Sequence, residues 1–316
     1  MPRIVFDTDL GIDDALALLY LLNSPEARIE AITTVHGNVP VETATANVFE
    51  VLDIAGVTER PPIARGSRTA LTGAGPNAID VHGNDGLGGW TQHGRVPLGD
   101  LLEISADELI VQLARKHPGE LTLLLIGPAT NAALAWRRDP EGFRQLKDIV
   151  AMSGAILEPG NTTAAAEFNA YADPEALAEV IASGVALTLV PLDVTRKAVL
   201  TREVVDRHLQ GRTDRRAEFL RCITAQGFAF YRKHLAWEGM YLHDPLAAGV
   251  VLDPAVVETQ RMELTIETQG EWTRGMTLAE RRPWRKGNEN ATVSLQVRAE
   301  LFVERFCQRV LRQKPI

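Results

Sequence analysis

The sequence predicts an α/β protein with an open, mostly parallel, Rossmann-like sheet that has a mixed edge and carries helices on both faces. Short apolar runs alternate with stretches of helical periodicity along the chain. The runs are apolar at nearly every position, as expected for parallel strands buried on both faces. Polar residues and glycines follow directly after several runs, where open α/β sheets place their ligands.

The first half of the chain shows this alternation. Residues 3–6 and 29–35 are apolar, and the second run is rich in the β-branched side chains that favour strands. Residues 14–22 and 41–52 have the apolar spacing of helices. Residues 66–94 differ, because they hold many glycines and show little periodicity. A loop of this length inside a compact domain is usually functional or disordered.

The second half of the chain continues the same pattern. Short buried-type runs predict strands at 121–126, 148–152 and 187–190. Helical spacing predicts helices at 129–136, 174–182 and 215–234. Because the chain has no internal repeat, low-complexity tract or clear linker, we expect a single domain over residues 1–316.

Composition excludes several classes of function. The 316 residues are 45% hydrophobic and 23% charged, as in an ordinary globular protein. A net charge of −8 and the lack of a basic stripe argue against nucleic acid as a partner. No apolar run approaches the roughly 20 residues that span a bilayer. Cys222 and Cys307 fit no metal spacing, and the N-terminus does not resemble a signal peptide, so we expect a cytoplasmic protein.

A cluster of acids follows the first expected strand. Asp7, Asp9, Asp13 and Asp14 lie within eight positions, between two apolar segments. Like charges a few Å apart repel by roughly 1 to 4 kcal/mol per pair, depending on the local dielectric. Because the flanking segments are core-type sequence, open water is a poor explanation for these acids. A hard divalent cation with oxygen ligands explains the cluster better.

Further polar clusters follow other strands and would share the same sheet edge. They are His36-Gly37-Asn38, Gly127-Pro128-Ala129-Thr130-Asn131, Ser153-Gly154 and Gly160-Asn161. Two more stand apart from strand ends. Glu167 and Asn169 would face the same way in an extended segment. His243-Asp244-Pro245 precedes an expected helix with Pro245 at its first position, where Asp244 suits a helix N-cap.

Three other interpretations of the acidic cluster were weighed. A haloacid-dehalogenase-type phosphohydrolase also opens with a strand and Asp-x-Asp, but the residues after Asp9 do not continue its pattern. An EF-hand loop fails because Gly11 stands at its fifth position and no Glu at its twelfth. A non-catalytic, metal-stabilised sugar-binding protein fits the composition, but does not explain why so many acids and amides gather at one edge.

The sequence resembles the inosine–uridine-type nucleoside hydrolase family over essentially its full length. Residues Asp7 to Ala15 match the family's D-x-D-x-G-x-D-D-A opening at every fixed position. Further matches follow in order: Gly37-Asn38, Val81-His82-Gly83, Gly127 to Asn131, Gly160-Asn161, Glu167-Phe168-Asn169, His243-Asp244-Pro245 and Thr273 to Thr277. One motif alone is weak evidence, whereas the ordered set is highly specific.

The resemblance implies a fold, a reaction and a set of site residues. It implies the family's α/β fold and the hydrolysis of ribonucleosides to free base and ribose by calcium-activated water. The implied ligands of the calcium ion (Ca2+) are Asp9, Asp14, Asp244 and the backbone carbonyl of Ile126. Asp9 would also be the general base. The implied ribose contacts are Asp13, Asn161, Glu167 and Asn169.

The remaining implied roles concern the water, the leaving base and the glycine-rich loop. Asn38 would steady the attacking water or a ribose hydroxyl. His243, near its normal pKa of about 6.5, would protonate the leaving base, and Tyr231 would contact that base. His82 lies in the 66–94 loop, which would close over the site. Relatives are commonly dimers or tetramers, so a homo-oligomer is expected.

Overall fold

The computed structural model describes residues 1–95, 97–285 and 287–312. Within these ranges the main sheet is built from β1 (Arg3–Thr8), β2 (Arg28–Thr34), β3 (Ile63–Arg65), β4 (Leu101–Leu102), β5 (Leu121–Leu125), β6 (Asp148–Met152), β7 (Leu187–Val190), β10 (Val257–Met262) and β13 (Ala291–Val297). Their order across the sheet is β10-β13-β7-β6-β5-β1-β2-β3-β4. Neighbouring strands are parallel except for β10 and β13, which confirms the mostly parallel sheet with a mixed edge.

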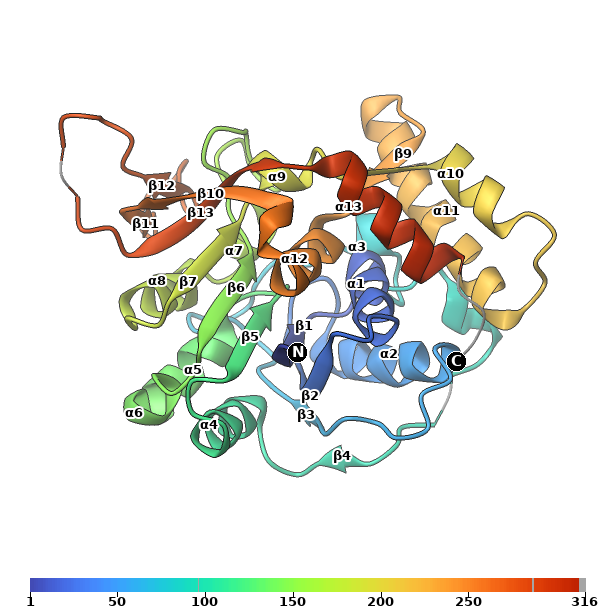
Figure 1. Ribbon diagram of the computed structural model, residues 1–316, viewed down its shortest axis with the longest axis horizontal. Helices are drawn as coiled ribbons and strands as arrows, with labels where there is room; N and C mark the ends of the chain where they lie inside the picture. Colours follow the sequence, from blue (N-terminus) through green and yellow to red (C-terminus); the bar gives the residue numbers. More distant parts are fainter. Residues whose placement is uncertain (96, 286, 313–316) are drawn as a thin grey trace.

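Helices cover both faces of this sheet (Figure 1). They are α1 (Ile12–Leu22), α2 (Val41–Ile54), α3 (Ile79–His82), α4 (Ala106–Lys116), α5 (Thr130–Arg138), α6 (Pro140–Phe143), α7 (Phe168–Ala172), α8 (Pro174–Ala182), α9 (Leu192–Thr195), α10 (Arg202–Leu209), α11 (Arg215–Leu235), α12 (His243–Leu252) and α13 (Ala299–Phe306). Two small antiparallel sheets pair β8 (Val199–Thr201) with β9 (Gly239–Tyr241), and β11 (Leu264–Ile266) with β12 (Thr277–Ala279).

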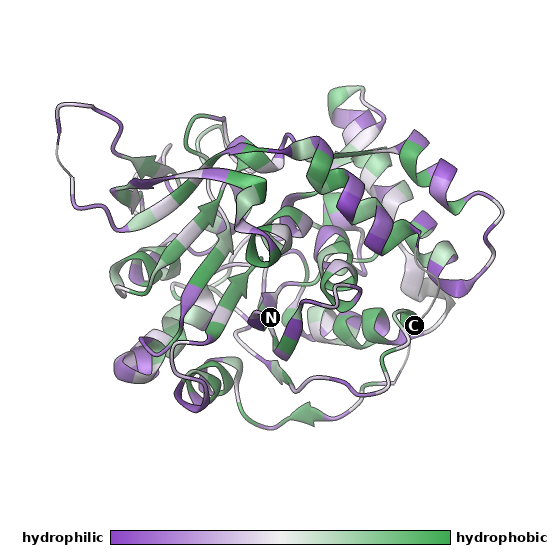
Figure 2. Cartoon of the chain, in the orientation of Figure 1, coloured by the Kyte–Doolittle hydropathy of each residue, from purple (hydrophilic) through white to green (hydrophobic). Residues whose placement is uncertain are grey.

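The alternation of side chains along each strand divides the apolar residues into two cores. Ile4 and Phe6 of β1 belong to one core with Leu124 of β5, whereas Val5 and Leu123 belong to the other. Residues of α1, α2, α11, α12 and α13 complete the first core, and those of α4, α5, α6 and α8 complete the second. Figure 2 shows the strands as mostly hydrophobic ribbons between these two helical layers.

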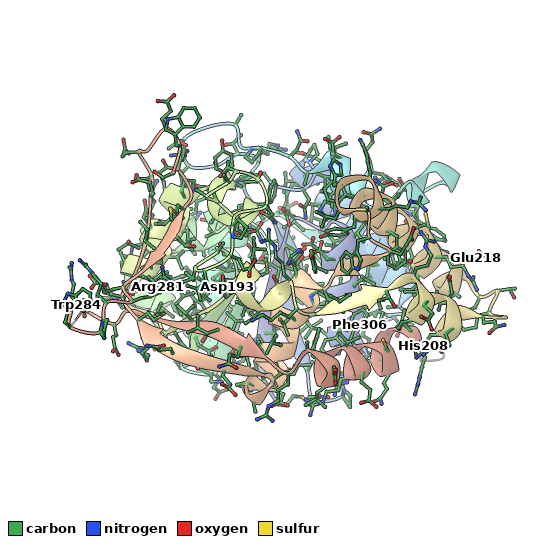
Figure 3. All side chains as sticks on the ribbon, turned by 90° about the horizontal axis from the view of Figure 1, so that it is seen from above. Asp193, His208, Glu218, Arg281, Trp284 and Phe306 are labelled. Atoms are coloured by element: carbon green, nitrogen blue, oxygen red, sulfur yellow. The ribbon has the colours of Figure 1, made fainter. Side chains whose placement is uncertain are left out.

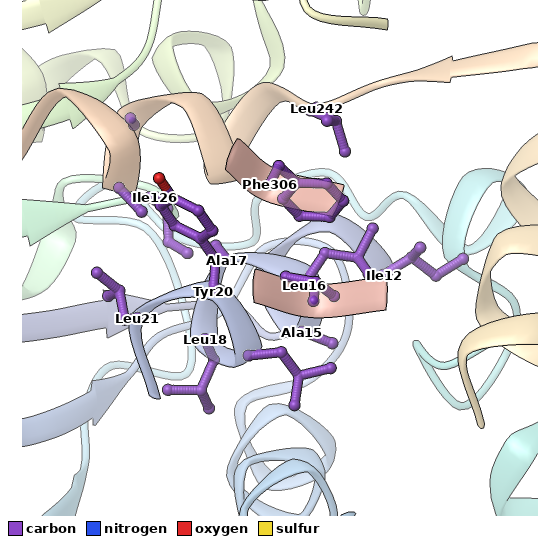
Figure 4. Packing of buried hydrophobic residues seen from close by; sticks show 14 of the residues in the cluster. Ile12, Ala15, Leu16, Ala17, Leu18, Tyr20, Leu21, Ile126, Leu242 and Phe306 are labelled. Carbon is purple, nitrogen blue, oxygen red and sulfur yellow. The ribbon is translucent and has the colours of Figure 1, made fainter. Parts of the chain in front are cut away.

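Helix α1 is apolar on nearly all sides because the first core surrounds it. Leu16 and its neighbours are buried, and Tyr20 packs against the rings of Phe302 and Phe306 of α13 (Figure 4). This packing fixes the position of the helix, and therefore of the acids in its first turn. Among the described residues, no helix combines the length and apolarity that a bilayer crossing requires.

Most of the expected elements form close to their expected bounds. The strands at 148–152 and 187–190 and the helix at 174–182 form with the expected bounds. The long helix at 215–234 forms with one residue more. The 66–94 loop contains the short helix α3 and a 3-10 turn at Trp90–His93, and its remainder is largely irregular. The single domain stays a prediction, although strands from residue 3 to residue 297 share one sheet.

The end of α11 contains a strained residue that offers a test of the fold. Ala236 caps this helix with φ +51 in the left-handed region, which costs an L residue roughly 1 to 2 kcal/mol and costs glycine little. Its side chain is exposed. We therefore expect Ala236→Gly to raise the free energy of unfolding by about 0.5 to 1 kcal/mol in urea denaturation.

The same substitution in the middle of the helix provides the control. Ala225 is exposed and lies within the regular part of α11. Ala225→Gly should lower the free energy of unfolding by about 1 kcal/mol. If Ala236→Gly lowered the free energy of unfolding as Ala225→Gly does, Ala236 would not be strained.

Candidate active site

The site lies where the direction of the sheet reverses. From β1 the chain builds β2, β3 and β4 on one side, and it then returns to place β5 on the other side of β1. A crevice forms beyond the carboxyl ends of strands at such a switch point, and ligands bind there. The loop from β1 to α1 carries Asp9, Asp13 and Asp14 into this position.

Asp9 is held in place by the loop that follows β2. Its carboxylate accepts hydrogen bonds from the Asn38 backbone N–H at 2.7 Å and from the Asn38 side-chain Nδ2 at 3.1 Å. A Cβ at Gly37, where φ is +152, would lie 2.0 Å from Asp9 Oδ2. A Cβ at Gly127 would lie 3.2 Å from Asp9 Cγ. These two glycines therefore provide the space that the Asp9 carboxylate occupies.

Asp14 faces the same space from the first turn of α1. Its carboxylate accepts hydrogen bonds from Thr8 Oγ1 at 2.5 Å, from the Gly11 N–H at 2.9 Å and from Asn38 Nδ2 at 3.0 Å. The amide of Asn38 thus links Asp9 to Asp14. The amino terminus of α1 also favours negative charge at this position.

Asp244 completes a group of three carboxylates with Asp13 and Asp14. One carboxylate oxygen from each lies within 4.8 Å of the others. Asp244 was expected as a possible N-cap, but α12 begins at His243, its N-cap is Leu242 and no side chain caps it. The helix begins two residues before Pro245, and Asp244 in its first turn lies beside the acids of α1.

Burial and mutual repulsion disfavour ionisation of these acids. Burial, followed by the charge of Asp14, raises the pKa of Asp13 to about 7 and raises that of Asp9 well above its usual range. Burial and then Asp13 raise the pKa of Asp244 in the same way. Carboxylates crowded in this way need positive charge to ionise together.

The donor set fits a hard divalent cation such as calcium, because every candidate ligand is an oxygen. Asp14 and Asp244 of the expected ligand set lie in the tight group, where Asp13 is their third member. Asp9 is linked to this group because Asn38 Nδ2 donates hydrogen bonds to both Asp9 and Asp14. The Ile126 carbonyl accepts a hydrogen bond from Asn169 Nδ2 at 3.0 Å. The ligand set itself remains a prediction.

Asp7 supports the cluster from behind. Its Oδ1 accepts hydrogen bonds from Thr33 Oγ1 on β2 and, at 2.7 Å, from Asn131 Nδ2 on α5. Burial raises the pKa of Asp7 to about 7. Asp7 therefore supports the site without facing it, because it ties β1 to its neighbours.

His82 brings the glycine-rich loop against the acidic cluster. Its Nδ1 accepts a hydrogen bond from the Ile12 N–H at 2.9 Å and lies 3.9 Å from Asp13 Oδ1. Because Nδ1 accepts and burial lowers the pKa of His82 to about 3, the ring is neutral and forms no ion pair with Asp13. Whether the loop closes on substrate stays a prediction.

Besides Asp13 on α1, the expected ribose-binding residues occupy one loop and the helix that follows it. Glu167 and Asn169 were expected in an extended segment, but Glu167 is the N-cap of α7 and accepts the backbone N–H groups of Asn169 and Ala170. The amide of Asn169 donates to the carbonyls of Ile126 and Met152, at the ends of β5 and β6. This capping keeps both side chains near the strand ends.

Asn161 lies on the same loop and is exposed. Its Oδ1 accepts a hydrogen bond from the backbone N–H of Phe168 at 2.9 Å. The loop backbone is also tied to Asp193, whose carboxylate accepts the N–H groups of Ile156 and Leu157. Figure 3 shows Asp193 near the middle of the molecule, on α9.

An aromatic group packs beside His243, the residue before Asp244. The Tyr231 hydroxyl on α11 is 3.4 Å from His243 Nε2, so the structure brings these two predicted residues together. The rings of Trp237 and Tyr241 pack against Tyr231, with ring centroids 5.8 and 5.1 Å away. His243 Nδ1 is 2.7 Å from Thr195 Oγ1.

The expected pKa of His243 is wrong. Burial, followed by the positive charge of Arg196, lowers the pKa of His243 to about 3, so the ring is neutral at pH 7. A normal value of about 6.5 assumed a solvated ring. The sequence pattern does not reveal how completely the aromatic group encloses this side chain.

The sequence analysis missed Thr195 and Tyr241. Thr195 lies five residues after the end of β7, on the same edge of the sheet as the acids. Polar residues that follow strand ends were expected to line the site, and the same expectation applied to β7 identifies Thr195. Tyr241 has no such signal, because it belongs to β9, which pairs with the short strand β8 outside the main sheet.

Comparisons with known proteins agree on one family. The family model described as inosine-uridine preferring nucleoside hydrolase matches residues 4–304. The chain is 35% identical over 309 residues to the non-specific ribonucleoside hydrolase RihC of Escherichia coli, covering 97% of this chain and 96% of that protein. It is 36% identical over 273 residues to uridine nucleosidase 1 of Arabidopsis thaliana, covering 85% and 79%.

Solved structures show the same relationship. The plant nucleoside hydrolase PpNRh1 has a TM-score of 0.91 and 30% identity, with 99% of each chain covered. A purine-preferring ribonucleoside hydrolase from Gardnerella vaginalis has a TM-score of 0.89 and 29% identity, with 98% of each chain covered. The architecture described above is therefore the one that these hydrolases share.

The crowded carboxylates lead to a prediction about stability. Calcium that binds the folded protein at about 100 times its Kd should raise the free energy of unfolding by about 2.7 kcal/mol. Asp244→Asn removes one buried acid, so in chelator the variant should melt at least as high as the wild type. Calcium should raise its melting temperature by much less. Differential scanning calorimetry with chelator and with calcium measures both effects.

Asp206→Asn is the matched control, because Asp206 is an exposed acid on α10, outside the cluster. This variant should keep the full calcium-dependent rise in melting temperature. An equal rise in Asp244→Asn and wild-type protein would contradict a cation site at Asp244.

Proposed function

The chain belongs to the family of inosine-uridine preferring nucleoside hydrolases, and from this premise we propose that calcium-assisted water cleaves the N-glycosidic bond of its ribonucleoside substrates. The products are the free base and ribose. The observation that supports this mechanism best is the convergence of Asp9, Asp13, Asp14 and Asp244 at the sheet switch point, opposite the Tyr231–His243 pair.

The acidic site suits the charge that develops during this reaction. As the bond to the base lengthens, positive charge builds on the ribosyl carbon, as in other glycoside hydrolysis. Fixed carboxylates stabilise that charge where it appears, without rearranging. We propose a direct, inverting displacement by water, with no covalent enzyme intermediate.

Asp9 is the proposed general base. Its two oxygens are fixed by the backbone and side chain of Asn38, so the carboxylate presents one orientation to the crevice. Asp9, Asp14, Asp244 and the Ile126 carbonyl are the proposed calcium ligands. When bound, the ion orients a water molecule and lowers its pKa. Asp9 accepts the proton of the attacking water, and Asn38 holds Asp9 during that transfer.

The ribose is the proposed partner of a second set of residues. Asp13, Glu167, Asn161 and Asn169 offer the carboxylate and amide groups that bind sugar hydroxyls, and His82 closes this side from the glycine-rich loop. Contacts to the hydroxyls supply binding energy that orients and distorts the sugar.

The leaving base is the proposed partner of Tyr231 and His243. Because His243 is neutral, it donates a hydrogen bond to this side of the site and does not act as an imidazolium ion. Negative charge that develops on the departing base is stabilised by these donors. The base finally gains one proton and the ribosyl carbon gains a hydroxyl, which together balance the water consumed.

The family match favours this function over the two interpretations that remained from the sequence, the haloacid-dehalogenase-type phosphohydrolase and the non-catalytic sugar-binding protein. We further propose that the protein is a cytoplasmic homo-oligomer, a dimer or a tetramer, with no nucleic acid partner. The net charge of −8 supports the last of these points.

The reaction can be tested directly with a panel of common nucleosides assayed for free ribose. The calcium-loaded protein should release ribose from at least one of them, and excess chelator should abolish the activity until calcium is restored. Asp9→Asn should lower kcat by a factor of about 100 or more, because a general base contributes about that much.

Asp206→Asn again serves as the matched control and should retain wild-type kcat. Full activity in chelator would remove calcium from the mechanism, and near-normal kcat in Asp9→Asn would remove Asp9 as the base. Release of phosphate from a phosphomonoester, without release of ribose, would support the phosphohydrolase instead.

A second test concerns the leaving group. His243→Ala should lower kcat for natural nucleosides by about 100-fold and lower kcat for a nitrophenyl riboside far less, because nitrophenolate leaves without a hydrogen-bond donor. Steady-state kinetics on both substrates measure the difference. Equal losses on the two substrates would exclude His243 from the leaving-group side.

A further inference from the structure

We propose that Thr195 is a positioning residue that fixes the tautomer of His243 and thereby aims the Tyr231 hydroxyl at the leaving base. The inference rests on the proposed function, because it concerns the leaving-group side of that reaction. It adds a residue that touches neither the acids nor the aromatic group directly. The contact that carries it is the 2.7 Å hydrogen bond between Thr195 Oγ1 and His243 Nδ1.

Thr195 is held rigidly at the end of α9. Its side chain is fully buried, and its backbone N–H donates to the Pro191 carbonyl at 3.2 Å. Asp193, in the same short helix, accepts two backbone N–H groups of the ribose-side loop. Arg196, the next residue, donates to the Gly160 carbonyl at 3.0 Å. The hydroxyl therefore occupies a fixed point between the two halves of the site.

The direction of the Thr195 hydrogen bond follows from its surroundings. Thr45 and Thr224, which are also buried in helices, donate their hydroxyl hydrogens to the carbonyls four residues earlier, at 2.6 Å. Thr195 makes no such bond, and within the described residues His243 Nδ1 is its one side-chain hydrogen-bond partner. A buried hydroxyl hydrogen without an acceptor is unfavourable, so Thr195 donates and Nδ1 accepts.

This direction places the ring hydrogen of His243 on Nε2. That atom lies 3.4 Å from the Tyr231 hydroxyl oxygen. With the Nε2 hydrogen directed at its oxygen, Tyr231 has its own hydrogen left to donate into the site. The opposite tautomer would present a bare Nε2 lone pair, which would draw the Tyr231 hydrogen away from the base.

Thr195 therefore acts on bond cleavage through His243 and Tyr231, and it matters most for leaving groups that need a hydrogen-bond donor. Binding of the ribose does not depend on this tautomer, because none of the hydrogen bonds described for Asn161, Glu167 and Asn169 involves Thr195 or His243. The expected signature is a loss in kcat for natural nucleosides, with KM little changed and with the nitrophenyl riboside spared.

The kinetic test uses the full chain saturated with calcium. Thr195→Val keeps the shape and removes the hydroxyl, and it should lower kcat for natural nucleosides by about tenfold or more, with the nitrophenyl riboside within about threefold of wild type. Thr195→Ser keeps the hydroxyl and should stay within about threefold on both substrates. Thr224→Val removes a buried hydroxyl outside the site and should leave both rates unchanged.

The structural test is nitrogen NMR of the histidine rings, with His243 assigned by its loss in His243→Gln. Wild-type protein should show a bare Nδ1 and a protonated Nε2, and Thr195→Val should lose that preference. A wild-type ring protonated on Nδ1 overturns the proposal, even if Thr195→Val fails to fold. An unchanged tautomer in Thr195→Val overturns it as well.

The two proposals fail in different ways. If the wild-type protein releases no ribose from any nucleoside, the proposed function fails, whereas the NMR result still decides the tautomer. If natural nucleosides are cleaved but Thr195→Val slows them no more than the nitrophenyl riboside, the function stands and the role of Thr195 falls.

Discussion

The repulsion among carboxylates buried at the end of β1 is the constraint on which the rest of the site depends. Asp13, Asp14 and Asp244 hold oxygens within 4.8 Å of one another, in a place where burial raises their pKa values. Such a group persists only if other parts of the fold hold it together. Asn38 bridges Asp9 and Asp14, the first turn of α1 favours their charge, and the apolar packing of α1 prevents the helix from moving away.

The same constraint explains why the side chains of Glu167 and Asn169 form hydrogen bonds with backbone groups. Glu167 accepts backbone N–H groups from its own helix, and Asn169 donates to the carbonyls that end β5 and β6. In the proposed reaction the site stabilises a short-lived cation, and such a site gains from dipoles that do not reorganise. The hydrogen bonds that shape the loops are therefore also the ones that orient the proposed ribose contacts.

The mostly parallel sheet and the gathering of acids at its carboxyl edge were predictable, because strands 148–152 and 187–190 have clear apolar patterns and Asp9 directly follows a strand. The two strands of the mixed edge, β10 and β13, have no counterpart among the strands expected from the apolar runs. Features that depend on tertiary packing were not predictable. Asp244 was weighed as a cap because local sequence cannot show the facing acids. The pKa of His243 was misjudged because the side chains that surround it come from other elements, α9, α11 and β9. Thr195 was missed because the strand-end rule was not applied to β7.

The origin of the side chains in different elements has an evolutionary consequence. The proposed general base, Asp9, comes from the loop after β1, whereas the residues proposed to meet the leaving base, Tyr231 and His243, come from α11 and α12. Substitutions around Tyr231 can therefore change which base is accepted without disturbing Asp9, which Gly37 and Gly127 enclose so closely that no larger residue fits beside it. The surroundings of Asp9 are therefore constrained, whereas the residues around Tyr231 can change among descendants of a common ancestor.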